Sequence, residues 1–281
     1  MDFGREYFGG VRLFFHSNGY PSLKPYLRIR FGESLGECCS EVGEKNSTND
    51  HSTRDMVCYM PMNSDMEWGA TGYRFVRLDF LEEGIFRLNR VYGTYVHSES
   101  DPIGSFECDN TLVNDIFNTA AHTLHLNMQN CIWDGIKRDR LVWIGDLNPE
   151  LKTIKYVFGD VSDVESALDF SSDLLEGKNW VNRMPSYSLW WIINAEEWCS
   201  YFKKKEYLKK RSNIINQIIK HNIIVTDRDK VIAVAGPLKK KYLGKEINEF
   251  TERSIERRDS FVERQKKTFF GKQTEISTSC F

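Results

Sequence analysis

The densest group of side chains able to do acid–base or hydrogen-bond chemistry lies in residues 131–146. This stretch holds three carboxylates, three cations and two indoles, and Gly135 and Gly145 give its backbone freedom to turn. Trp side chains are rarely left in water, so two of them in a connection between helices indicate a ligand or a covered surface. The side chains concerned are Asp134, Asp139, Asp146, Lys137, Arg138, Arg140, Trp133 and Trp143.

Two interpretations of this stretch stand side by side. It suits a carbohydrate, because sugar C–H faces stack on indoles, hydroxyls pair with carboxylates and Arg, and one carboxyl can be held protonated as an acid. It equally suits a structural salt-bridge network beneath an aromatic lid, since ion-pair networks produce similar clusters. Calcium binding by the three Asp is disfavoured, because the alternating ligands and turn Gly of an EF-hand are absent.

Residues before about 108 alternate apolar and polar side chains, which predicts strands with one buried face. The clearest examples are residues 11–15, 27–31 and 76–80, with separators rich in Gly, Asn, Ser and Pro. Six or so such strands predict an antiparallel β-sandwich over residues 1–107.

From Asp109 onward the apolar period becomes helical. Start signals stand at Asp109-Asn110, at Asn148-Pro149-Glu150, at Ser162 with Glu165, and at Pro185, and a fifth helix is expected over residues 206–220. At the second of these starts, Glu150 is a carboxylate that the helix dipole favours. Residues 221–235 look strand-like, and the remainder to 281 is a charged tail expected to be solvated.

Composition excludes several classes. The 281 residues carry 38 Lys and Arg against 40 Asp and Glu, a net charge of −2, which argues against nucleic-acid binding. No apolar run is long enough to span a membrane. The seven Cys show no zinc-ligand spacing and are expected to be free thiols. His122 and His125 share a helix face without a third ligand, so a structural pair is expected and no metal.

The segment around Asp134 resembles the signature of bacterial α-L-rhamnosidases of glycoside hydrolase family 78, Asp/Cys, four residues, then Glu-Arg-Leu-x-Trp-x-Gly-Asp. Asp134, Arg140-Leu141, Trp143 and Gly145-Asp146 agree in register, whereas Asp139 stands where the family often has Glu. Residues 2–13, 30–33, 72–76 and 104–108 resemble the sandwich that precedes the family's catalytic domain and its exit into the first barrel helix.

The resemblance implies a multi-domain β + α fold: a sandwich accessory domain (1–107), the first helices of an incomplete (α/α)6 barrel of the six-hairpin glycosidase type (108–220), and an atypical segment (221–281). It implies removal of terminal α-L-rhamnose from glycosides, oligosaccharides or polysaccharides by an inverting mechanism, without a cofactor. Asp139 would be the general acid. The substrate-binding residues would be Asp134, Arg140, Trp143, Asp146, Trp190 and Trp191, with Arg140 also orienting the acid.

The family's general base is a Glu from late in the barrel, and no Glu after residue 220 has a matching context. The enzyme interpretation therefore competes with a non-catalytic sugar-binding remnant or truncated product. A half barrel would also leave apolar helix faces exposed. Residues 1–5 lack the basic and apolar regions of a signal peptide, yet family members are commonly exported, so the compartment stays open.

Overall fold

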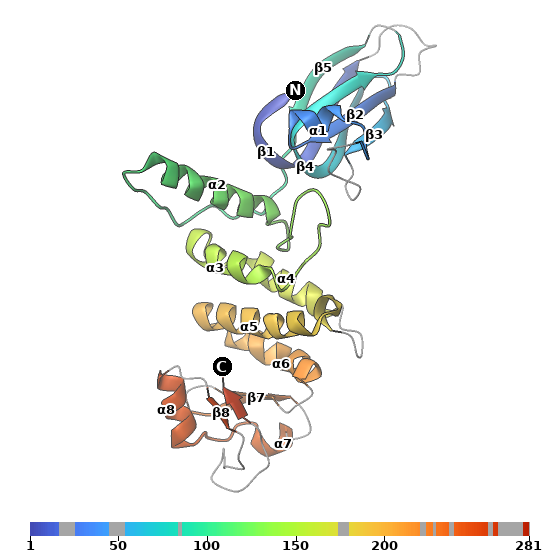
Figure 1. Cartoon of the computed structure of the whole chain (residues 1–281). Coiled ribbons are helices and arrows are strands. Elements are labelled where there is room, and N and C mark those ends of the chain that lie inside the picture. Colours follow the sequence, from blue (N-terminus) through green and yellow to red (C-terminus); the bar gives the residue numbers. More distant parts are fainter. Residues whose placement is uncertain are drawn as a thin grey trace. The chain divides into compact units, whose positions relative to one another are not determined.

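The structure is a computed structural model that describes residues 1–16, 26–44, 54–83, 86–173, 180–219, 223–226, 229–235, 239–257, 261–263 and 278–280 (Figure 1). The chain divides into two compact units, Met1–Ser171 and Ser172–Phe281. Each unit is described by itself.

The first unit begins with a five-stranded antiparallel sheet of order β3-β2-β4-β1-β5. Its strands are β1 (Asp2–His16), β2 (Tyr26–Gly32), β3 (Asp55–Tyr59), β4 (Ser64–Phe80) and β5 (Arg87–Gly93), and the short helix α1 (Leu35–Cys39) follows β2. The three segments predicted as strands from their alternation lie within β1, β2 and β4, which confirms them.

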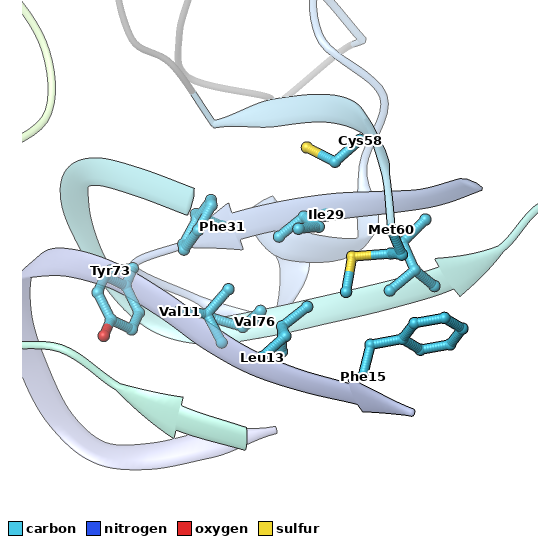
Figure 2. Close-up of a cluster of buried hydrophobic side chains, with 10 residues drawn as sticks. Val11, Leu13, Phe15, Ile29, Phe31, Cys58, Met60, Tyr73 and Val76 are labelled. Carbon is cyan, nitrogen blue, oxygen red and sulfur yellow. The ribbon is translucent and has the colours of Figure 1, made fainter. Parts of the chain in front are cut away.

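One face of this sheet forms a hydrophobic core of the first unit (Figure 2). Alternate residues of β1 and β2 point into it, because successive side chains of a strand face opposite sides. Tyr73 is fully buried there, and its hydroxyl donates to the carbonyl oxygens of Gly10 at 2.6 Å and Thr94 at 3.0 Å. The buried members are Val11, Leu13, Phe15, Leu27, Ile29, Phe31, Cys58, Met60, Tyr73 and Val76.

Three helices follow the sheet: α2 (Thr111–Asn127), α3 (Leu147–Val157) and α4 (Ser162–Asp173). Asn110 caps α2, since its side-chain oxygen accepts from the N–H groups of Leu112 and Val113 at 3.0 and 3.4 Å. Helix α3 begins at Leu147, one residue before its predicted start signal. Much of the first turns of α2 is exposed, including Leu112 and Ile116.

The second unit contains a 3₁₀ turn (Val181–Arg183), α5 (Pro185–Phe202) and α6 (Lys205–Ile219). Beyond them lie β6 (Ile223–Thr226), β7 (Val231–Ala235), α7 (Lys239–Tyr242), α8 (Glu249–Arg257), β8 (Phe261–Glu263) and β9 (Thr278–Cys280). Strands β6 and β7 pair antiparallel, and Val231, Val234 and Tyr242 form a small buried cluster. None of the helices that the structure describes is long and apolar enough to cross a membrane.

The order of strands followed by helices is as predicted. The expected two-sheet sandwich and (α/α)6 barrel are not seen among the described residues. The described strands of the first unit form one sheet, and the described helices do not close a barrel. Strands β1 and β4 run 15 and 17 residues, with register shifts around Gly9 and Gly10. Such bulges bend long strands, so one sheet can enclose a core without a separate second sheet.

Candidate functional site

The predicted motif forms an irregular loop between α2 and α3. Asp134 and Leu141 close it: the Asp134 N–H donates to the Leu141 carbonyl oxygen at 3.0 Å, and the Leu141 N–H donates to Asp134 Oδ1 at 2.7 Å. These bonds bring the ends of residues 134–141 together and leave Asp139 inside the loop. Burial raises the pKa of Asp134, partly offset by the hydrogen bond from Leu141.

Asp139 and Arg140 both adopt the left-handed backbone conformation, with φ of 57° and 45°. Non-glycine residues rarely do so, and such strain concentrates at functional sites. Beside them lies a pocket of about 440 Å³ lined by Glu33, Asp134, Gly135, Ile136, Lys137, Arg138 and Asp139. Two carboxylates of the motif therefore share one hollow.

Arg140 packs between two aromatic rings and a Gln side chain. Its guanidinium carbon lies 4.0 Å from the ring centre of Phe8 and 4.9 Å from that of Trp133, and Nη2 donates to Gln129 Oε1 at 2.7 Å. Burial lowers the pKa of Arg140. Arg140 makes no side-chain hydrogen bond to Asp139 among the described residues, so the structure assigns it a stacking role, and the predicted role of orienting the acid stays a prediction.

Two neighbours in the loop fasten it to the sheet. Ile136 is buried with Phe8 and Leu126 and lies so close to Gly72 that a Cβ there would come within 2.6 Å of Ile136 Cγ1. Lys137 is buried as well, and its ammonium donates to Glu33 and Glu37 from the corner between β2 and α1. Glu33, in the connection between β2 and α1, therefore completes the wall of the pocket beside the loop residues.

Asp146 is the residue before α3, and Glu150 lies one turn later in that helix. The spacing of four places both on one face of the helix. Burial, with Asp146 and Asp134 nearby, raises the pKa of Glu150 to about 8. Glu150 therefore keeps its proton at neutral pH, although its place in the first helical turn predicts a stabilised carboxylate. The i,i+4 spacing from Asp146 is the sequence signal that could have included it in the site.

The predicted aromatic walls lie in different parts of the chain. Trp143 is half-buried in the loop, and its carbonyl oxygen accepts from the Asp146 and Leu147 N–H groups at 3.1 and 3.2 Å. Trp190 and Trp191 belong to α5 in the second unit, where Trp190 is partly exposed and Trp191 is fully buried. Their predicted contact with substrate stays a prediction.

The His pair of α2 has backbone partners. His122 Nε2 lies 2.9 Å from the Glu6 carbonyl oxygen, and His125 Nε2 lies 3.3 Å from that of Ser98. The His125 ring also packs against His97 and Phe158. These contacts fit a structural pair that joins the helix to the sheet.

Two family models match adjoining parts of this chain. Residues 101–203 match the bacterial α-L-rhamnosidase six-hairpin glycosidase domain. Residues 204–279 match the C-terminal domain of stage V sporulation protein T, described as a transcription factor. Stage V sporulation protein T of Bacillus subtilis (strain 168) is 35% identical over 63 residues, which are 22% of this chain and 35% of that protein. Sequence reasoning missed this second similarity.

Similar solved structures are rhamnosidases. A Klebsiella oxytoca rhamnosidase with rhamnose bound has a TM-score of 0.65 at 16% identity, over 83% of this chain and 51% of that one. A family 78 rhamnosidase of Bacillus sp. GL1 has a TM-score of 0.62 at 19% identity, and the Dictyoglumus thermophilum α-L-rhamnosidase 0.60 at 20%. Each covers 78% of this chain, and the matched parts are 23% and 26% of those chains. This chain thus spans about half of the Klebsiella structure and about a quarter of the other two.

Proposed function

Given that this chain contains a rhamnosidase-like six-hairpin glycosidase segment, we propose that residues 131–150 form the acid side of a site for terminal α-L-rhamnose. Asp139 is the general acid that protonates the departing glycosidic oxygen. Asp134 and Asp146 accept hydrogen bonds from sugar hydroxyls, and Trp143 packs against an apolar sugar face.

The observation that carries this proposal is the shared pocket of Asp134 and Asp139. Both carboxylates line the same hollow of about 440 Å³, a size that suits a small ligand. The closure of the loop by Asp134 and Leu141 supplies the rigidity that a sugar site needs.

In the hydrolytic reaction, the acid proton moves to the glycosidic oxygen as the bond to the anomeric carbon breaks. Water attacks that carbon from the opposite face, and a carboxylate across the ring takes its proton, which inverts the configuration. Asp134, Asp146 and Trp143 supply binding, and Asp139 supplies the acid. The half-buried Glu150, protonated at neutral pH, keeps further negative charge from building up beside Asp134 and Asp146.

Sugar binding without turnover is the second candidate. It is favoured by the match of residues 204–279 to a different family, because the six-hairpin match ends at residue 203. A chain of this build would hold the acid and the hydroxyl ligands and leave the water unactivated. Removal of a general base typically costs a factor of about 10² to 10⁴ in rate.

Hydrolysis of p-nitrophenyl α-L-rhamnoside and calorimetric binding of L-rhamnose together test both candidates. For the hydrolase, Asp139→Asn should lower the rate at least about 100-fold with little change in affinity. For the binding protein, the unaltered chain should release no nitrophenol yet bind L-rhamnose, and Asp134→Ala should abolish binding. Absence of saturable L-rhamnose binding contradicts both.

A further inference from the structure

Lys137 is a buried cation held by two carboxylates at the corner between β2 and α1. It is 9% exposed, and Nζ lies 2.5 Å from Glu33 Oε2 and 2.9 Å from Glu37 Oε1. Burial alone would lower the pKa of Lys137, but the hydrogen bonds to the two carboxylates raise it. A buried ion pair that loses one member leaves an uncompensated charge, so this contact is costly to break.

The corner that supplies the two carboxylates is itself rigid. Ser34 caps α1, since its Oγ accepts from the Glu37 N–H at 3.1 Å. Glu37 Oε2 accepts from the Glu33 N–H at 2.9 Å, so each oxygen of Glu37 has a donor. Glu37 is 6% exposed. Lys137, two residues before Asp139, therefore binds to a rigid corner between β2 and α1.

We propose that Lys137 is a positioning residue of the sugar site, which fixes the loop of Asp139 to the corner formed by Glu33 and Glu37. The sheet then acts as the holder of the acid loop rather than as a separate accessory module. This inference rests on the proposed function of Asp139. Glu33 then has two roles: it binds Lys137, and it lines the pocket.

Glu6 of β1 limits the pH range of this arrangement. Its Oε1 is buried and has no hydrogen-bond donor among the described residues, while Glu33, Lys137 and Glu37 are its charged neighbours. From α2, the His122 ring contacts the Glu6 backbone oxygen. Burial and the adjacent Glu33 raise the pKa of Glu6 to about 8. Ionisation of Glu6 puts a further negative charge beside Glu33, which the single Lys137 cannot balance, so the loop should loosen above about pH 8.

Amide hydrogen exchange, measured without sugar, tests the fastening. Lys137→Met should lower the protection factors of residues 133–141 at least about tenfold at pH 7, with residues 27–31 of the core strand changed less than about twofold. Lys137→Arg should restore part of the protection. The exposed Lys152 of α3 provides the matched control, Lys152→Met, which should leave both segments unchanged. Unaltered protection of residues 133–141 in Lys137→Met overturns the proposal.

The pH profile is the second test, and it separates positioning from simple stability. Protection of residues 133–141 and affinity for L-rhamnose should both hold up to pH 7 and fall between pH 8 and 9. Glu6→Gln, which is neutral at every pH, should remove the fall in protection; the fall in affinity should disappear only when Glu150→Gln is added, because Glu150 also ionises near pH 8. A fall in protection that persists in Glu6→Gln overturns the role of Glu6. If no rhamnose binds, the proposed sugar site fails, but hydrogen exchange still tests whether Lys137 holds the loop in place.

Discussion

Asp134 and Leu141 bond to each other twice, once through backbone N–H and carbonyl and once through the Asp134 carboxylate. The side chain predicted to hold a sugar hydroxyl thus also closes the loop that carries Asp139. Oδ1 is committed to the Leu141 N–H, and no hydrogen bond to Oδ2 occurs among the described residues. Asp134 therefore combines a structural hydrogen bond with a place in the lining of the pocket.

Asp134→Asn and Asp134→Ala should separate these two duties. Asn keeps an oxygen acceptor for the Leu141 N–H, so its stability should stay within about 0.5 kcal/mol, while rhamnose affinity should fall about 10-fold or more with the lost charge. Ala should cost about 1–2 kcal/mol of stability as well, because the N–H loses its partner. Chemical denaturation and calorimetry measure both quantities. Equal destabilisation by Asn and Ala would contradict the assignment.

Arg140→Met should destabilise the loop by about 1–2 kcal/mol. Met retains much of the apolar contact with Phe8 and Trp133 but loses the cation–π attraction and the hydrogen bond to Gln129. Trp fluorescence should report the change, because the guanidinium lies over Trp133. The neighbouring Arg138, which is exposed, serves as control: Arg138→Met should leave stability within about 0.5 kcal/mol. Equal destabilisation by Arg140→Met and Arg138→Met would contradict a stabilising role for the contacts of Arg140 with Phe8, Trp133 and Gln129.

Gly72→Ala should cost about 1–3 kcal/mol and loosen the loop. The added Cβ would lie 2.6 Å from Cγ1 and 2.7 Å from Cδ1 of Ile136, so that side chain must move out of its site. Gly36→Ala is the matched control, since a Cβ there meets nothing nearer than 4.0 Å and Ala favours the helix. Thermal unfolding compares the two, and a Gly72→Ala variant as stable as Gly36→Ala would contradict the close packing.

The local elements were predictable because their signals are local. Alternation along residues 11–15 and 27–31, the Asn110 cap and Pro185 each act within a few residues, and the strands and helices appear where these signals stand. The motif loop was also visible, since its composition is unusual within a span of 16 residues. The contact of Arg140 with Phe8 could not be assigned, because it depends on β1 folding against the loop.

Long-range partners explain what sequence reasoning missed. Lys137 meets Glu33 and Glu37 across 104 and 100 residues of chain, and His122 meets Glu6 across 116. No spacing in the sequence encodes these pairs. The raised pKa of Glu150 likewise depends on burial, whereas a helix start alone predicts the opposite direction.

Glu150 should make stability fall as pH rises through the neutral range. Its pKa is raised to about 8, so the folded chain retains a proton that the unfolded chain releases above about pH 4.5. Below pH 4.5 both states are protonated and above pH 8 both are ionised, so the loss lies between these values, at most about 1.4 kcal/mol per pH unit. Denaturant unfolding at several pH values should give a shallower decline for Glu150→Gln than for the unaltered chain. A Glu150→Gln profile parallel to the unaltered one would refute the buried proton.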